Sequence, residues 1–108
     1  MESLPLPIQR ALQRLGQGVS LARRRRHISQ HDLAERIGAS VSTVRRMEEG
    51  HPGTALQHLA RAMQVFGDLG KLEGLLDTPQ DAVGLALMDD KLPQRVRRSR
   101  NASDSRGF

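Results

Sequence analysis

The 108-residue sequence predicts an all-α fold. No segment shows the strict alternation of apolar and polar residues that a half-buried strand requires. Apolar residues instead recur three or four positions apart, which is the spacing of one helix face. Serine and glycine residues stand where these stripes begin and end, as they do at helix termini. Together the three observations predict five to six helices.

The first helix is expected from Ile8 onward. Its apolar stripe consists of Ile8, Ala11, Leu12, Leu15, Val19 and Ala22. Gly16 and Gly18 lie within this stripe, and glycine in a helix interior costs about 1 kcal/mol relative to alanine. We expect the two glycines to weaken this helix and to mark a place where it could split.

Two short helices should follow, joined by a tight link. Ser29 with Asp32 three residues later has the spacing of a capping box, and Gly38 should end that helix with a positive φ. Ser40 should cap the next helix, which Gly50 stops. Five apolar residues form the inner faces of the pair: Leu33, Ala34, Ile37, Val44 and Met47.

Three further helices are expected after a turn at 51–53. Thr54 is the expected cap of a helix that ends at Gly67, with a stripe at Leu56, Leu59, Ala60, Met63 and Phe66. A short fifth helix would carry Leu69, Leu72, Leu75 and Leu76. Thr78, Pro79 and Asp81 indicate the start of a sixth, with Val83, Leu85, Ala86 and Met88 on its stripe and Leu92-Pro93 at its end.

Charge is divided into three blocks along the chain. Residues 1–67 carry ten basic and five acidic side chains, a net charge of +5. Residues 68–90 carry one lysine and six acidic side chains, a net charge of −5, and residues 91–108 return to +5. Each block could be a solvated surface, but such segregation also indicates that basic and acidic parts face different partners. The last twelve residues contain almost no apolar side chains and should form a flexible basic tail.

Composition excludes several classes of function. Phe66 and Phe108 are the only aromatic residues, which makes a base-stacking platform for RNA or single strands untenable. Without cysteine there is no disulfide, no cysteine-ligated zinc and no thiol nucleophile. No apolar run approaches the about 20 residues of a membrane span, and the first ten residues lack a signal-peptide core. We expect a soluble cytoplasmic protein with no membrane partner.

Neither a metal site nor catalysis is expected. His27 and His31 are four residues apart, but the cap at Ser29 separates them, and no third ligand accompanies either His51 or His58. No Ser–His–Asp spacing, glycine-rich phosphate loop or paired-carboxylate motif is present. The sequence therefore predicts a protein that is no enzyme and has no cofactor.

The most informative segment is SQHDLAERIGASVSTVRRMEEG, residues 29–50. Its two short helices are joined by Gly38-Ala39-Ser40, a link too short for an antiparallel arrangement, so the helices should meet at a steep angle. Ala34 is small where the two helices approach each other. This segment resembles the Xre/Cro family of helix-turn-helix DNA-binding domains, and with its flanking helices the resemblance covers residues 16–67.

The resemblance implies a domain organisation and a set of contacts to double-stranded DNA. Residues 1–15 would be an N-terminal helical extension, 16–77 the DNA-binding domain, and 78–108 a C-terminal helix and basic tail. The helix at 41–49 would enter the major groove. Four side chains on it are expected to contact bases: Val41, Ser42, Arg45 and Arg46. Six are expected to contact phosphates: Gln30, Ser40, Thr43, Arg24, Arg25 and Arg26.

Alternatives exist for the base contacts of Arg45 and Arg46 and for the role of Arg23. The sequence departs from the common family pattern because neither residue 41 nor residue 42 is glutamine, which favours reading of guanine by Arg45 and Arg46 over reading of adenine by an amide. Contact of both arginines with phosphates alone is the alternative. Arg23 and Glu48 match a pair that commonly forms a partly buried salt bridge in the family, although Arg23 could instead belong to the solvated run 23–26.

The whole arrangement resembles the HipB-type antitoxins that accompany HipA-like serine/threonine kinase toxins. The segment VGLALMDDKLPQRVR at 83–97 is the most similar part outside the motif. This resemblance implies a homodimeric bacterial repressor, nucleoid-associated when bound to DNA, that controls its own operon and binds the kinase. Four tail side chains could contact DNA or toxin: Arg95, Arg97, Arg98 and Arg100. A stand-alone phage-like repressor and a protein-interaction module without DNA binding are the alternatives.

Overall fold

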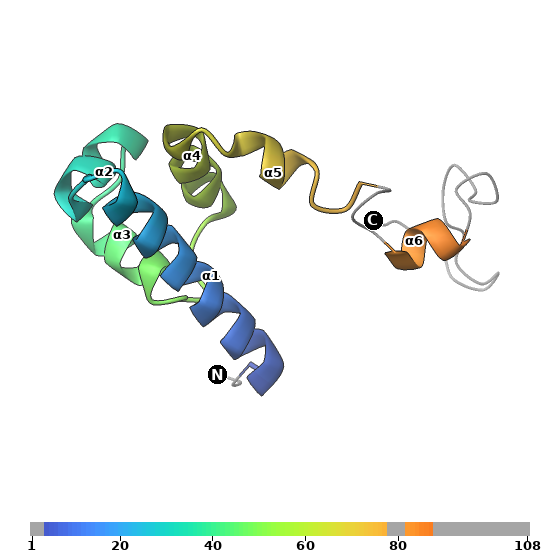
Figure 1. Ribbon diagram of the computed structural model, residues 1–108. Helices are drawn as coiled ribbons and strands as arrows, with labels where there is room; N and C mark the ends of the chain where they lie inside the picture. Colours follow the sequence, from blue (N-terminus) through green and yellow to red (C-terminus); the bar gives the residue numbers. More distant parts are fainter. Residues whose placement is uncertain (1–3, 78–81, 88–108) are drawn as a thin grey trace, which may run out of the picture. The chain divides into compact units, whose positions relative to one another are not determined.

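A computed structural model of the chain describes residues 4–77 and 82–87, and every element within these residues is a helix (Figure 1). The helices are α1 (Leu6–Arg25), α2 (Gln30–Ile37), α3 (Val41–Glu48), α4 (Leu56–Phe66), α5 (Leu69–Glu73) and α6 (Ala82–Leu87). Backbone contacts divide the chain into two units, Met1–Glu73 and Gly74–Phe108. Helices α1 to α5 belong to the first unit and α6 to the second, and the predicted all-α fold is confirmed.

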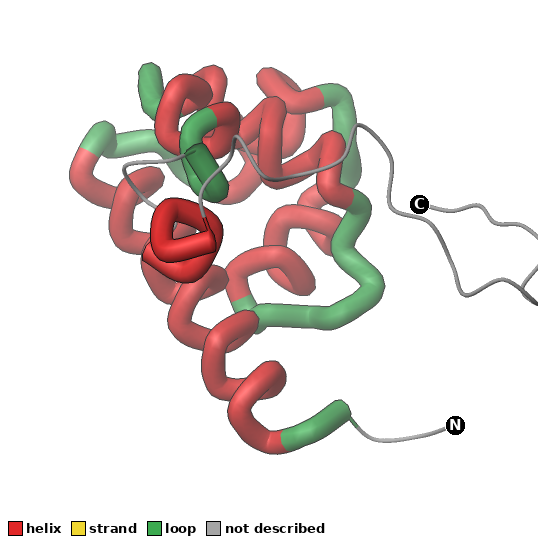
Figure 2. Tube along the Cα trace, turned by 90° about the vertical axis from the view of Figure 1, so that its right-hand side faces the viewer, coloured by secondary structure: helices red, strands yellow, loops and turns green. Residues whose placement is uncertain are grey.

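Helix α1 is continuous, so the expectation that Gly16 and Gly18 could split it is wrong (Figure 2). Gly16 is needed for close packing between helices. A Cβ atom at this position would lie 2.5 Å from the carbonyl oxygen of Glu48 and 2.7 Å from that of Met47. A Cβ at Gly18 would meet nothing within 4 Å. The helix also runs through residues 15 and 16, where the sequence suggested a domain boundary.

The ends of α2 and α3 lie where the local signals place them. The Ser29 hydroxyl accepts a hydrogen bond of 2.9 Å from the Asp32 amide, and the Ser40 hydroxyl accepts one of 3.1 Å from the Thr43 amide. Gly38 ends α2 with φ 69° and Gly50 follows α3 with φ 80°. These caps satisfy amide groups that have no partner inside their own helix. The two helices of the motif are thus defined by short-range interactions.

Helices α4 and α5 differ from the sequence-based expectations. Ala55 precedes α4 and makes no side-chain cap, while the Thr54 hydroxyl oxygen is buried without a partner among the described residues. Leu56 of the predicted stripe is 69% exposed, whereas Phe66 of the same stripe is buried and Leu59 packs against the core; Ala62 adds to this buried face. Helix α4 does end at Gly67 as predicted, with φ 82°.

Helix α5 ends at Glu73, so Leu75 and Leu76 lie beyond it and are exposed. Helix α6 falls within the sixth predicted helix. The proposed start signals of that helix at 78–81, its residue Met88 and its end at Leu92-Pro93 lie outside the described residues.

The hydrophobic core is built from residues of the four helices α1, α2, α3 and α4, together with Ile28 between α1 and α2. Its buried members are Val19, Ile28, Leu33, Ala34, Ile37, Val44, Met47, Ala62 and Phe66. Leu33 and Val44 are fully buried, and each such side chain contributes about 1.5–3 kcal/mol relative to exposure to water. The N-terminal part of the predicted α1 stripe stays outside the core, since Ile8 and Leu15 are almost half exposed. None of the described helices is both long and apolar enough to cross a bilayer.

Candidate nucleic-acid interface

The helix-turn-helix consists of α2, a turn at 38–40 and α3. Ile37 and Val44 pack into the core from the two sides of the turn, and the Ala39 amide donates a 2.9 Å hydrogen bond to the Ala34 carbonyl. Ala34 is buried, as its small size at the approach of the two helices predicts. Because both helices are fixed by core contacts and caps, α3 presents its remaining face in one orientation.

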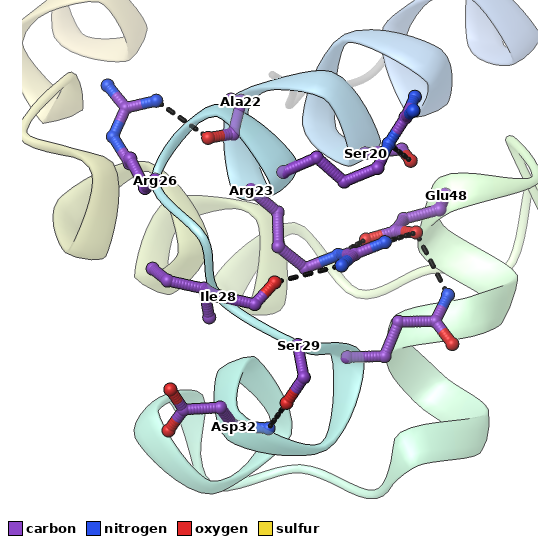
Figure 3. Close-up of polar contacts among 10 residues, drawn as sticks. Ser20, Ala22, Arg23, Arg26, Ile28, Ser29, Asp32 and Glu48 are labelled. Atoms are coloured by element: carbon purple, nitrogen blue, oxygen red, sulfur yellow. Dashed lines mark hydrogen bonds and ion pairs between the residues drawn. The ribbon is translucent and has the colours of Figure 1, made fainter.

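An ion pair between Arg23 and Glu48 ties α1 to α3 (Figure 3). Nε of Arg23 donates to one carboxylate oxygen at 2.6 Å and Nη2 donates to the other at 3.0 Å. Nη1 of Arg23 donates to the Ile28 carbonyl at 2.9 Å. The side chains are only 11% and 7% exposed. Such a bidentate pair fixes orientation as well as distance, so it sets the position of α3 relative to α1.

Gln30 extends this network from α2. Its side-chain Nε2 donates to the Glu48 carboxylate at 3.0 Å, so the carboxylate links three helices. Burial alone would raise the pKa of Glu48, but the hydrogen bonds from Arg23 and Gln30 and the charge of Arg23 outweigh it, and the pKa lies below its ordinary value. Glu48 is therefore ionised at neutral pH.

Three of the four side chains expected to contact bases are exposed on the surface of α3. Ser42, Arg45 and Arg46 are exposed. Val41 is half-buried and packs against the edge of the core, which limits its reach. Among the described residues, neither Arg45 nor Arg46 has an ion pair or a side-chain hydrogen bond. Their guanidinium groups are available to a ligand.

Three of the six side chains expected to contact phosphates lie at the N-termini of α2 and α3. Ser40 caps α3 and Thr43 lies in its first turn, and their hydroxyl oxygens are 3.0 Å apart. Gln30 occupies the first position of α2 and is held by Glu48. A helix N-terminus with free amide groups suits a phosphate, and these residues lie at two such termini.

The consecutive arginines at the end of α1 lie in different environments and have different hydrogen-bond partners. Arg24 and Arg25 are exposed, and Nε of Arg24 donates to the Ser20 hydroxyl at 3.3 Å. Arg26 donates to the Ala22 carbonyl at 2.8 Å and to the Phe66 carbonyl at 2.9 Å, and its guanidinium lies 5.1 Å from the centre of the Phe66 ring. Arg26 thus joins the C-terminal ends of α1 and α4, a contact that sequence reasoning missed.

The other candidate site residues are the histidines, considered as metal ligands, and the arginines of the tail. Within the described part of the chain, no three His, Cys, Asp or Glu side chains gather in a way that could hold a metal ion. Nδ1 of His51 accepts a 2.8 Å hydrogen bond from the Gly53 amide and so stabilises the turn. The tail residues Arg95, Arg97, Arg98 and Arg100 lie outside the described residues.

Comparison with known protein families agrees with this geometry. Residues 19–72 match the helix-turn-helix family HTH_3, a region that spans half of the chain and runs from within α1 into α5. No curated protein and no solved structure gives a significant match. The matched region contains the whole core and the Arg23–Glu48–Gln30 network. The chain therefore belongs to the Xre-type helix-turn-helix family and is a DNA-binding transcription regulator.

Proposed function

We propose that this protein is a sequence-specific repressor that binds double-stranded DNA as a homodimer. One observation supports this most directly: α3 carries two exposed arginines that have no partner among the described residues, on a helix that an ion pair fixes to α1. A rigid helix with free guanidinium groups suits the major groove, where arginine can bond O6 and N7 of guanine together. Two copies would read two half-sites about one helical turn apart.

In this proposal the base contacts come from Val41, Ser42, Arg45 and Arg46. Phosphate contacts come from the two helix N-termini and from the end of α1, through Gln30, Ser40, Thr43, Arg24, Arg25 and Arg26. Arg26 can serve DNA only with the guanidinium nitrogens that its bonds to Ala22 and Phe66 leave free. It should therefore contribute less to DNA affinity than Arg24 or Arg25.

The repressor is further proposed to act as the antitoxin of a HipA-like kinase and to repress its own operon. The support is the sequence of 83–97 together with the acidic block 68–90. DNA would repel an acidic segment, whereas a protein partner with a basic surface would attract it. A stand-alone repressor is the alternative, and a kinase gene next to this one would distinguish the two.

The test combines a gel shift with co-purification. The tagged chain is co-expressed with its genomic neighbour, purified, and titrated onto the DNA upstream of its own gene. A shifted band with a kinase-sized partner is expected, and a shifted band without a partner would leave the stand-alone repressor. No shift at low salt would overturn DNA binding and favour the protein-interaction module.

Arg46 gives a second test on the same DNA. Arg46→Ala should weaken binding by about 1–3 kcal/mol and relax the preference at one base pair. Arg36→Ala is the matched control, because Arg36 is also exposed but pairs with Asp32 at 3.2 Å on α2. Equal footprints and affinities for Arg46→Ala and the unaltered protein would remove Arg46 from base reading.

A further inference from the structure

An open pocket lies beside α3, the helix proposed to enter the major groove, and no sequence pattern indicated this pocket. It measures 390 Å³ and lies between α1, the start of α2 and the last turn of α3. Helix α1 contributes Gln17, Ser20 and Arg24, which share one helix face because they are three and four residues apart. Helix α3 contributes Arg45. The pocket therefore connects α1 with the helix proposed to face DNA.

The charges around this pocket favour an anion. Arg24 and Arg45 bring two guanidinium groups from different helices. Glu48 also lines the pocket, but Arg23 bonds both of its carboxylate oxygens and balances its charge. Glu49, which is exposed, is the remaining acidic side chain of the lining. Apart from the Arg23–Glu48 pair, two positive charges thus face one negative charge.

Two polar side chains of the lining, Arg24 and Gln30, already have hydrogen-bond partners within the domain. Nε of Arg24 donates a hydrogen bond to the Ser20 hydroxyl, which leaves the terminal nitrogens of its guanidinium free to donate to a ligand. Gln30 uses one N–H for Glu48 and retains a second N–H. Arg45 lines the pocket, whereas Arg46 does not. The two neighbouring arginines of α3 thus have different surroundings.

We propose that this pocket binds one phosphate of the DNA backbone, held between Arg24 of α1 and Arg45 of α3. Arg45 then orients the domain on the duplex in place of the base contact assigned to it above, and base reading by arginine falls to Arg46. The proposal rests on the DNA binding proposed above and deepens it, since it assigns Arg24 of α1 and Arg45 of α3 to one shared phosphate and separates the roles of two adjacent arginines. A phosphate contact carries no sequence information, so the two roles can be told apart by experiment.

The experiment measures binding to a fluorescein-labelled 30-base-pair duplex of random sequence by anisotropy, over a series of salt concentrations. Each phosphate contact contributes about 0.9 to the slope of log affinity against log salt. Arg24→Ala and Arg45→Ala should each reduce the slope by about that amount, whereas Arg46→Ala should reduce it less, because a base contact neutralises no phosphate. Arg45→Lys should retain most of the slope, because a lysine can still pair with a phosphate as a point charge.

Matched controls separate this inference from the proposed function. Arg36→Ala removes an exposed arginine outside the pocket and should not change the slope. If the unaltered protein shows no salt-dependent binding to the duplex, DNA binding itself fails. If it binds but Arg45→Ala keeps the full slope, the phosphate pocket is wrong while DNA binding stands. Thermal melting checks that each variant is folded, which is expected because Arg24 and Arg45 are exposed.

Two further variants test the shared phosphate and the charge balance. If Arg24 and Arg45 hold the same phosphate, their effects are coupled, and the double alanine variant should lose less affinity than the product of the two single losses. Independent, multiplicative losses would overturn a shared site. Glu49→Gln removes the remaining acidic charge and should raise affinity about two- to fivefold, as expected for one exposed charge interaction. Unchanged or lower affinity would overturn the charge argument.

Discussion

At the scale of single residues, Glu48 is the carboxylate that links α1, α2 and α3. It accepts two hydrogen bonds from Arg23 and one from Gln30, on a side chain that is only 7% exposed. Its pKa is lowered in the folded protein despite the opposing effect of burial. A group with a depressed folded pKa stabilises the protein above its unfolded pKa, and this stability is lost as the pH falls through the folded pKa.

The stability of the Glu48→Gln variant should therefore differ from that of the unaltered protein in a pH-dependent way. At pH 7 we expect the variant to be less stable by about 1–3 kcal/mol, because an ion pair becomes a neutral hydrogen bond. The difference should shrink as the pH falls below the ordinary glutamate range. Urea unfolding followed by circular dichroism measures it, with exposed Glu35→Gln on α2 as the control. A difference that stays constant with pH would contradict the role of Glu48 ionisation.

Thr54 provides a second test at this scale. It has the sequence appearance of a helix cap, yet its hydroxyl is buried without a partner among the described residues. Thr54→Val should thus be neutral or stabilise the protein by up to about 1 kcal/mol, since the valine has no polar group to desolvate. Ser29→Ala removes a real cap and should cost about 1 kcal/mol. Thermal unfolding compares the two, and an equal loss in both would mean that Thr54 acts as a cap.

At the scale of elements, the contact between α1 and α3 depends on the absence of a side chain at Gly16. Gly16→Ala would place a Cβ 2.5 Å from backbone of α3, and we expect a loss of about 1–3 kcal/mol together with weaker DNA binding. Gly18→Ala has no such conflict and should stabilise α1 by up to about 1 kcal/mol. Chemical unfolding of both variants measures the change in the free energy of unfolding. Stabilisation by Gly16→Ala would mean that the helices can separate without cost.

How well the sequence predicted each element depends on the range of the interactions that form it. The ends of α2 and α3 were correct because Ser29 and Ser40 bond amides three residues away. The continuity of α1 and the exposure of Leu56 were not, although Phe66 of the predicted α4 stripe is buried and Leu59 packs against the core. A glycine is needed at position 16 because the backbone of α3 lies too close for a side chain. Leu56 is exposed because α4 contributes to the core through residues further along the helix, Ala62 and Phe66. Local helix propensity depends on nearby residues, so it cannot predict either of these tertiary contacts.

At the scale of the whole molecule, the contacts separate Met1–Glu73 from the rest. Within 4–77 and 82–87, the buried core residues and the Arg23–Glu48–Gln30 network all lie in this first unit. A chain of residues 1–77 should therefore unfold cooperatively with a melting temperature within about 4 °C of the full chain, which corresponds to less than about 1 kcal/mol. Calorimetry measures it. A larger decrease would show that residues 78–108 contribute to the stability of the domain.

The sequence by itself determined the all-α class, the helix-turn-helix and the termini of its helices, because capping and turn formation act within a few residues. Only the tertiary structure decided that α1 continues through Gly16, that Arg26 joins α1 to α4, and that Arg24 and Arg45 line one pocket. The residues in these contacts lie about 20 to 40 positions apart. Their proximity follows from how the helices pack, and packing is set by the shape of the whole core rather than by any short segment.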